Sequence, residues 1–212
     1  MSYKISDTTK ETLIQTAGRL LAEKGFGNVS AKEIARTAHM VPNAITYHFE
    51  SKNNLFAAVW DYVGQHWSVA EFESYCRTHE SLLKTKEGQV ELVKQSIRLL
   101  FEKICPLNDD SWVSRFVARA MMTKEGKDWV HQRVVKPIDA QLSRLYFEIT
   151  GAHDAESAFC WGLNIVAPIS YFSINVLSNE LYQQKKLETA HIYNRLLEMT
   201  IENTLSALDL KG

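Results

Sequence analysis

The chain lacks several features that define other protein classes. Its 212 residues hold three cysteines, Cys76, Cys105 and Cys160, an odd number without the CxxC spacing of a zinc site. The N-terminal residues contain no hydrophobic stretch like that of a secretory signal, and no apolar run reaches the roughly 18 residues of a membrane span. These absences argue against a disulfide framework. They favour reduced cysteines in a cytoplasmic protein without a membrane partner.

Residues that break regular structure are also scarce, with 4 prolines and 9 glycines. No alternating strand pattern of useful length interrupts the helical spacing of apolar residues. The composition, 45% hydrophobic and 23% charged, is that of an ordinary globular protein. We therefore predict an all-α fold.

Catalytic and metal-binding signals are missing as well. The seven histidines are scattered, with no HExxH motif and no cluster with cysteine at ligand spacing. The sequence contains no GxSxG motif and no glycine-rich phosphate-binding loop. We expect a protein that is not an enzyme and that carries no metal and no cofactor. An enzyme built on the helical region would have no acid–base or metal constellation to support it.

Charge is distributed unevenly along the chain. The net charge is −1, but residues 1–52 carry +2 and the remainder −3. This asymmetry permits nucleic-acid binding by the first segment without proving it, because affinity depends on a local basic patch.

The segment 30–60 contains the signals of two short helices joined by a tight turn, followed by a third helix. Ser30 and Glu33 form a capping box at the start of the first of these helices. His39 and Met40 form the turn, and the second helix is expected to begin at Val41-Pro42. Ser51 is a suitable N-cap for the third. This is the helix-turn-helix pattern, whose second helix enters the major groove of DNA.

The second short helix carries side chains suited to that role. Base edges can be contacted by Pro42, Asn43, Thr46 and Tyr47. The next positions, His48 and Lys52, are expected to contact phosphates. The alternative is that Tyr47 is a core aromatic and His48 an ordinary surface histidine, whereas Phe49 is expected in the core in either case.

Residues 9–60 resemble the DNA-binding domain of the TetR (tetracycline-repressor) family of transcriptional regulators. The resemblance implies phosphate contacts from Ser30, Lys32, Tyr47, His48 and Lys52. The chain departs from the family at the turn, where His39 replaces the usual Gly, and at Val41, where Ser or Asn is common. These departures affect the expected base contacts but not the docking mode. The matching residues are Ser30, Ile34-Ala35, Ala38, Tyr47-His48-Phe49, Ser51-Lys52 and Leu55.

The resemblance also implies a two-domain organisation. Residues 1–52 would form the three-helix DNA-binding domain, and residues 53–212 a larger helical domain for effector binding and dimerisation. Two long helices, expected at 153–179 and 187–208, would form a four-helix bundle with a second subunit. Alternatively, their apolar stripes only close the core of one subunit. The predicted interface residues are Phe159, Gly162, Val166, Ile169, Ile192, Leu196, Met199 and Leu205.

A small-molecule cavity in the second domain would be lined by aromatic and apolar side chains with a few polar ones. Each candidate can equally be an ordinary core residue. The candidates are Trp67, Phe101, Trp112, Phe116, Met121, Trp161, Asn164 and Tyr171.

These patterns together predict a homodimeric, ligand-responsive transcriptional repressor that binds a near-palindromic operator in double-stranded DNA and is released by a small-molecule effector. The alternative is an all-helical small-molecule-binding or protein-interaction module without DNA binding. Activation in place of repression also stays open, because it depends on where the operator lies.

Overall fold

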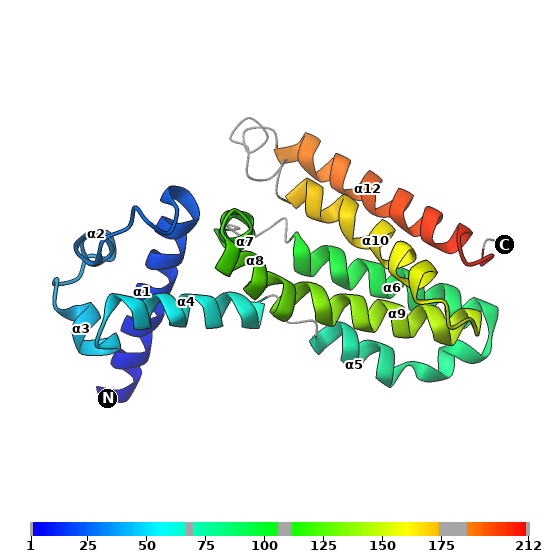
Figure 1. Cartoon of the computed structure of the whole chain (residues 1–212), viewed down its shortest axis with the longest axis horizontal. Helices are drawn as coiled ribbons and strands as arrows, with labels where there is room; N and C mark the ends of the chain where they lie inside the picture. The colour runs from blue at the N-terminus through cyan, green and yellow to red at the C-terminus, as the bar shows by residue number, and fades with distance from the viewer. Residues whose placement is uncertain (1, 67–69, 106–111, 174–185, 211–212) are drawn as a thin grey trace. The chain divides into compact units, whose positions relative to one another are not determined.

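The computed structural model describes residues 2–66, 70–105, 112–173 and 186–210, and within these ranges the chain is helical with no strand. Contacts divide it into two compact units (Figure 1). The first unit comprises residues 1–66 and 112–127, and the second comprises 67–111 and 128–212. The sequence prediction placed the division at residue 52, whereas the contacts group the following helix and a later segment with the N-terminal helices.

The first unit is built from four consecutive helices and one that comes later in the sequence. Its helices begin and end where local signals place them: Gly25, with φ +82°, follows the first, and Ser30 accepts from the Glu33 amide at 3.1 Å. The Ser51 hydroxyl likewise accepts from the amide of Asn54 at 3.1 Å. The helices are α1 (Ser2–Lys24), α2 (Ala31–Thr37), α3 (Ala44–Phe49), α4 (Lys52–His66) and α7 (Trp112–Ala120), followed by the start of α8 (Lys124–Val130).

Two boundaries differ from the sequence prediction. The spacing of apolar residues predicts that the first helix starts at Thr8 or Thr9, whereas α1 starts at Ser2. The helix predicted to begin at Val41-Pro42 begins at Ala44, after a turn. Residues 67–69, inside the single helix that the apolar spacing predicts over 52–77, lie outside the described residues, between the end of α4 at His66 and the start of α5 (Ala70–Thr78).

An aromatic cluster holds α7 against α1 and α4. We define it as Phe26, Trp60, Tyr62, Trp112 and Phe116. The Phe116 ring meets Trp60 and Phe26 edge-on, with centroids 4.7 and 5.1 Å away, and Tyr62 stacks on Trp112 at 5.5 Å. Edge-on and stacked arrangements are the favoured geometries of aromatic pairs. The cluster therefore explains why α7 belongs to the first unit.

Polar contacts complete the α1–α7 packing. The Gln15 side chain accepts from the Trp112 indole at 2.9 Å and donates to the Tyr62 hydroxyl, so part-buried polar groups of three helices satisfy one another. The Arg119 guanidinium donates to the carbonyls of Ala22 and Glu23, which lie in the last turn of α1. Carbonyls at a helix C-terminus lack partners within their own helix, so Arg119 caps α1 from a distant part of the sequence.

The second unit is a bundle of longer helices, in which α6 contacts α12 and α10 packs on both α9 and α12. Its core includes Phe101, whose ring lies 5.8 Å from Tyr193, and the buried Cys105. Burial raises the pKa of the Cys105 thiol to about 12, so the thiol stays neutral. The elements are α5 (Ala70–Thr78), η1 (Glu80–Lys84), α6 (Lys86–Ile104), the end of α8, a π-helical turn (His131–Val135), α9 (Lys136–Thr150), α10 (Ala155–Tyr171) and α12 (Lys186–Ser206).

None of the helices in the described ranges has both the length and the apolar character needed to span a bilayer.

Candidate functional site

The turn between α2 and α3 is formed by a histidine in a left-handed conformation. His39 has φ 57°, and the Met40 amide donates back to the carbonyl of Ala35 at 2.8 Å. His39 stands where the family that the sequence resembles usually has Gly, and its backbone has the positive φ that favours Gly. A side chain with a Cβ is strained in this region, so His39 holds the turn at an energetic cost.

Helix α3 buries one face and exposes the other. Ala44 and Ile45 are buried against the first unit, while Thr46 and Tyr47 are exposed, Tyr47 by 83% of its surface. The Tyr47 ring meets His48 edge-on, with centroids 4.8 Å apart. The prediction that Tyr47 points outward is consistent with this geometry, and the alternative of a core aromatic is not. Phe49 is only partly buried.

The residues preceding α3 are exposed too. Val41, Pro42 and Asn43 all face solvent, and Val41 exposes 69% of its surface. The Asn43 side chain makes no capping bond to α3, so its amide is available to a ligand such as a base edge. The four residues predicted to contact bases therefore share one exposed edge of the first unit.

Predicted phosphate contacts flank this edge. Lys32 is exposed on α2, and Ser30 is exposed at the cap of the same helix. The Lys52 ammonium lies 3.4 Å from the Val29 carbonyl and 5.3 Å from the centre of the Phe56 ring. These two contacts with its own unit limit where the Lys52 charge can lie.

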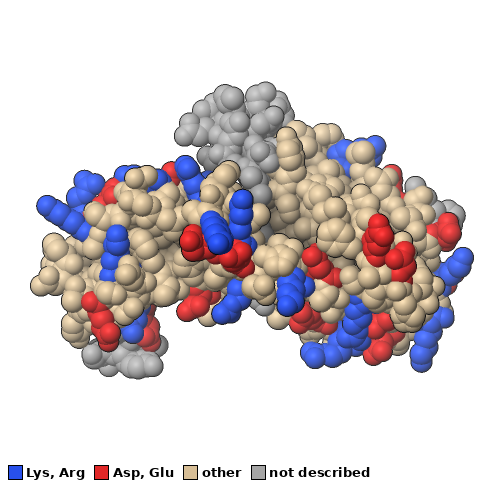
Figure 2. All heavy atoms as spheres, viewed as in Figure 1, with Lys and Arg blue, Asp and Glu red and all other residues tan. Residues whose placement is uncertain are grey.

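One basic residue was missed by sequence reasoning. Arg36 is exposed on α2, one helical turn after Lys32, so both cations lie on the same helix face. The i, i+4 spacing is visible in the sequence and could have identified it. Figure 2 shows Lys and Arg side chains projecting from the outer edge of the first unit, with Asp and Glu side chains nearby, and a similar mixture over the second unit.

A shallow hollow of about 420 Å³ adjoins α3. Its floor is largely apolar and includes Met40, Val41 and Ala44, with Tyr47 at its margin. The remaining lining residues are Thr9, Asn43 and His48.

The described residues predicted to line an effector cavity are divided between the two units. Trp112 and Phe116 belong to the aromatic cluster of the first unit, where both are buried by protein contacts. Phe101 and Trp161 are buried in the second unit, and the Trp161 indole approaches the Thr204 carbonyl at 3.4 Å. These four are core residues, the alternative that the sequence left open.

The other predicted effector-lining residues lie elsewhere. The Asn164 amide donates to the Cys160 carbonyl one turn earlier on an exposed face of α10. Met121 is 39% exposed in the first unit, and Tyr171 is 68% exposed on α10. Trp67 lies outside the described residues.

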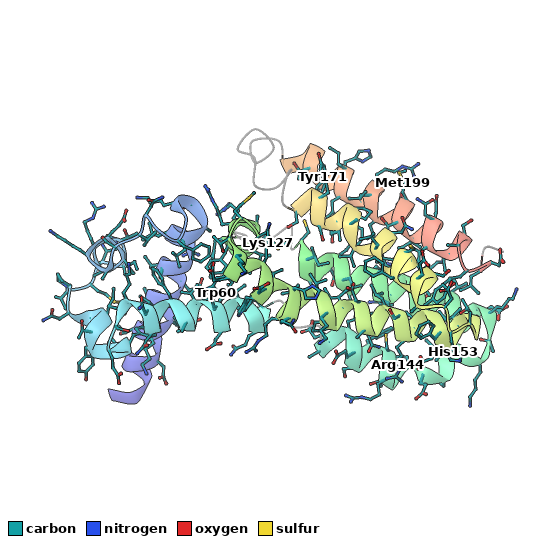
Figure 3. All side chains as sticks on the ribbon, in the orientation of Figure 1. Trp60, Lys127, Arg144, His153, Tyr171 and Met199 are labelled. Atoms are coloured by element: carbon teal, nitrogen blue, oxygen red, sulfur yellow. The ribbon has the colours of Figure 1, made fainter. Side chains whose placement is uncertain are left out.

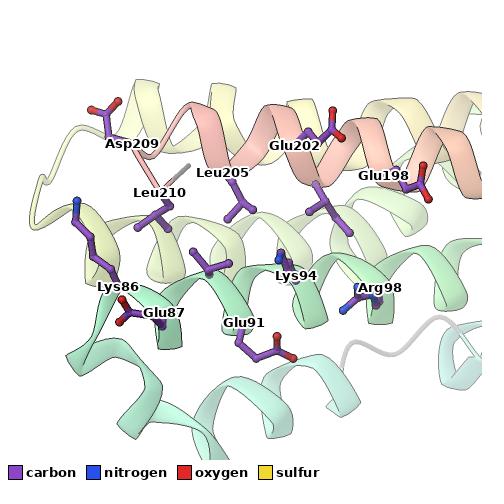
Figure 4. Close-up of a pocket in the computed structure, with 12 residues that line it drawn as sticks. Lys86, Glu87, Glu91, Lys94, Arg98, Glu198, Glu202, Leu205, Asp209 and Leu210 are labelled. Carbon is purple, nitrogen blue, oxygen red and sulfur yellow. The ribbon is translucent and has the colours of Figure 1, made fainter. Parts of the chain in front are cut away.

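The second unit instead has a groove between α6 and α12, with a volume of about 790 Å³ (Figure 4). Apolar side chains such as Val90, Ile201 and Leu205 line it, and charged side chains border it. The cations Lys86, Lys94 and Arg98 all come from α6. The charged residues that α12 and the turn after it place at the groove are all acidic. The acidic residues at the groove are Glu87, Glu91, Glu198, Glu202 and Asp209.

Helices α10 and α12 together expose an apolar surface, which we call the α10–α12 face. Figure 3 labels Tyr171 on α10 and Met199 on α12. Of the eight predicted interface residues, Phe159, Ile192 and Met199 are exposed by 44–51%, and Val166 and Leu196 are partly exposed. Leu163, which lies on the same apolar stripe of α10, is 50% exposed one turn after Phe159. The α10–α12 face comprises Phe159, Leu163, Tyr171, Ile192 and Met199.

Three predicted interface residues point into the unit, which corrects the prediction. Ile169 is fully buried, and Leu205 is 6% exposed and lines the α6–α12 groove. Gly162 is buried where a Cβ would lie 3.4 Å from Leu142, so it allows close approach of α9 and not of a partner. The amphipathic pattern alone does not show which residues of the apolar stripe are buried by the chain's own helices.

Residues 13–59, which span the helices just described, match the sequence family "Bacterial regulatory proteins, tetR family". Residues 13–59 thus form a TetR-type segment at the N-terminal end of this chain. It is 27% identical over 154 residues to the "HTH-type transcriptional dual regulator CecR" of Shigella flexneri, covering 68% of this chain and 66% of that protein. It is 26% identical over 112 residues to the "Probable acrEF/envCD operon repressor" of Escherichia coli K12, covering 48% and 50%.

The chain thus spans about half to two thirds of the length of these TetR-family relatives. A solved transcriptional regulator from Rhodococcus sp. Rha1 has a similar fold, with a TM-score of 0.59 at 17% identity, over 93% of this chain and 96% of the other.

Proposed function

We propose that this chain is a ligand-responsive TetR-family transcriptional repressor that binds near-palindromic double-stranded DNA as a homodimer. The observation that supports it most directly is the exposed edge formed by Pro42, Asn43, Thr46 and Tyr47, flanked by the cations of α2 and Lys52. A helix that presents small polar side chains between phosphate-binding groups fits the major groove. The Escherichia coli relative bears the name of an operon repressor, which favours repression.

Dimerisation would proceed through the α10–α12 face. Five large apolar side chains exposed on two neighbouring helices are unusual for a surface in contact with water alone. A second copy of the same face covers them, and two-fold symmetry then presents two α3 helices to two half-sites of an inverted repeat.

The α6–α12 groove is the effector site that the geometry favours, in place of the buried aromatic residues. Its volume of about 790 Å³ lies within the roughly 300–1,000 Å³ of small-molecule pockets, and it combines an apolar lining with charged groups. Filling the groove with Val90→Trp should leave DNA binding intact and abolish release by any effector found in a ligand screen. Continued release by that effector would move the site elsewhere.

The DNA-binding proposal is tested with duplexes selected from a random pool by the purified protein. Fluorescence anisotropy of a selected duplex should show binding that weakens steeply with salt, because phosphate contacts release counterions. Replacing Lys52 by Ala should weaken binding and reduce the slope of log K against log salt by about 1. Tyr47→Ala should weaken it further.

Lys84→Ala in the second unit is the matched control, since Lys84 is also exposed and carries the same charge. It should leave both affinity and slope unchanged. If the protein selects no sequence and the two lysine variants behave alike, the chain is a helical binding module without DNA recognition. Transcription in vitro from the promoter that carries the selected sequence then distinguishes repression from activation.

A further inference from the structure

The edge that precedes α3 contains an exposed valine, whose side chain has no group able to form a hydrogen bond. Val41 exposes 69% of its surface, stands where the family commonly has Ser or Asn, and its side chain neither donates nor accepts a hydrogen bond. Its position on the proposed DNA-binding edge therefore needs an apolar counterpart if it is to contribute to recognition.

Val41 does not stand alone. Tyr47 exposes 83% of its surface one helical turn into α3, and both residues line the hollow of about 420 Å³. Met40 and Ala44 supply further apolar lining between them. The hollow, which Thr9, Asn43 and His48 also line, is thus a largely apolar recess in a polar surface. The cations Lys32 and Arg36 on the preceding helix and the acid Glu50 after α3 are exposed on that surface.

The chemistry of the major groove limits what can occupy such a recess. Base edges present hydrogen-bond donors and acceptors there, and the one apolar group among them is the C5-methyl of thymine. Phosphates require charged or polar partners, which the flanking cations supply. An apolar recess between phosphate-binding residues therefore matches a pyrimidine methyl group.

We propose that Val41 and Tyr47 recognise the C5-methyl group of a thymine in each half-site of the operator. This proposal rests on the proposed DNA-binding function and adds to it the group that is read. Removal of the methyl, as in uracil, leaves all hydrogen-bonding groups of the base unchanged. The contribution of the methyl alone can therefore be measured.

The experiment uses the full chain and a duplex that it selects from random DNA. Each thymine of one half-site is replaced in turn by deoxyuridine, and affinity is measured by anisotropy at fixed salt. At one or two positions the wild-type protein should bind about fourfold more weakly, the amount expected for loss of one buried methyl group. Replacement in both half-sites should weaken binding by about the square of that factor.

Two variants assign the effect to Val41. In Val41→Ser the penalty for deoxyuridine should fall below about twofold at the sensitive position, because the partner of the methyl is gone. In Val41→Thr, which keeps one methyl on a side chain of the same shape, most of the penalty should remain. Because Val41 is largely exposed, both variants should unfold at the wild-type temperature.

The outcomes separate this inference from the function beneath it. A protein that selects no sequence overturns both. A selected operator whose thymines can all be replaced with less than a twofold loss, or one without thymine near the half-site centre, overturns the methyl contact alone. A penalty that is equal in wild type and Val41→Ser shows that another residue reads the methyl, and it overturns the assignment.

Discussion

The two units differ in where their exposed large apolar side chains lie. In the first unit five aromatic residues form one buried or half-buried cluster, and the exposed large apolar side chains are Val41 and Tyr47 near α3 and Met121 and Met122 just after α7. In the second unit the aromatic residues Phe101 and Trp161 are core, yet five large apolar side chains remain on the α10–α12 face. In the proposed function, the exposed apolar side chains near α3 contact DNA, whereas the α10–α12 face contacts a second copy of the chain.

The largest effect is expected when the side chain at the centre of the aromatic cluster is removed. Phe116 is fully buried and contacts rings from two other segments of the first unit. Phe116→Ala should lower the free energy of unfolding by about 3–5 kcal/mol through lost burial and an unfilled cavity. Urea denaturation followed by tryptophan fluorescence measures this. Met122→Ala, at a residue 81% exposed just after α7, should change stability by less than about 0.5 kcal/mol.

A loss below about 1 kcal/mol for Phe116→Ala would contradict the view that α7 stabilises the first unit. Loss of DNA binding in parallel with the loss of folded protein would agree with it, because α7 would then hold the DNA-binding helices in place.

A smaller effect is expected where α1 and α7 approach each other most closely. A Cβ placed on Gly18 would lie 2.3 Å from the Trp112 ring, well inside van der Waals contact. Gly18→Ala therefore forces the ring or the helix to move and should cost about 1–3 kcal/mol, despite the better helix propensity of Ala. Gly27→Ala is the control, because nothing lies within 4 Å of its Cβ position. Equal stability of the two variants would show that the contact yields easily.

The sequence revealed most of the first four helices because their signals are local. The Ser30 cap, the stop at Gly25 and the Ser51 cap each act within a few residues, and all three are present. The proposed DNA-binding edge follows from them, since the exposed face of a short helix is fixed once its ends are known.

The aromatic cluster could not be deduced in this way. The bond between Gln15 and Trp112 joins residues 97 positions apart, and no local pattern specifies which distant helix fills a given core. For the same reason Trp112 and Phe116 were taken for cavity residues. The apolar stripe of α10 also did not show which residues face outward, because Gly162 and Ile169 pack inward while their neighbour Leu163 faces outward.

The exposed face of the second unit yields the next prediction. Leu163 is 50% exposed at the centre of the α10 stripe. Leu163→Glu should place two like charges near the symmetry axis of a dimer and weaken self-association at least about tenfold, with little effect on the stability of the unit. Sedimentation equilibrium measures the dissociation constant. Met122→Glu, an equally exposed apolar position in the first unit, should leave association unchanged.

If Leu163→Glu and wild type sediment alike, the α10–α12 face is not the dimer interface. The contrast between the two units would then need another explanation.

The turn before α3 allows a stabilising substitution. His39 holds φ 57° at the cost of crowding its Cβ, which Gly does not have. His39→Gly should raise the free energy of unfolding by about 0.5–1 kcal/mol, the strain relieved being partly offset by the greater freedom of glycine in the unfolded chain. Thermal unfolding followed by circular dichroism measures it. A fall in stability would show that the His39 side chain contributes contacts that outweigh the strain.

The smallest expected effect concerns the ion pair between α1 and α2. Lys24 pairs with Glu33. The pKa of the Glu33 carboxyl is lower than its usual value, and the hydrogen bond from Lys24 is the largest cause of this shift. A carboxyl whose pKa is lower in the folded state stabilises the fold above its unfolded pKa of about 4.3, and that stabilisation is lost as pH falls through the folded pKa. Glu33→Gln should therefore lower Tm slightly at pH 7 and not at all near pH 2, because the wild-type carboxyl is then protonated as well. Since the Lys24 side chain is exposed and the Glu33 side chain partly exposed, solvent screens the pair, and salt should also reduce the difference. A Tm difference that persists unchanged at low pH would assign the effect to the helix cap at Ser30, which Gln cannot complete in the same way, and not to the charge of Glu33.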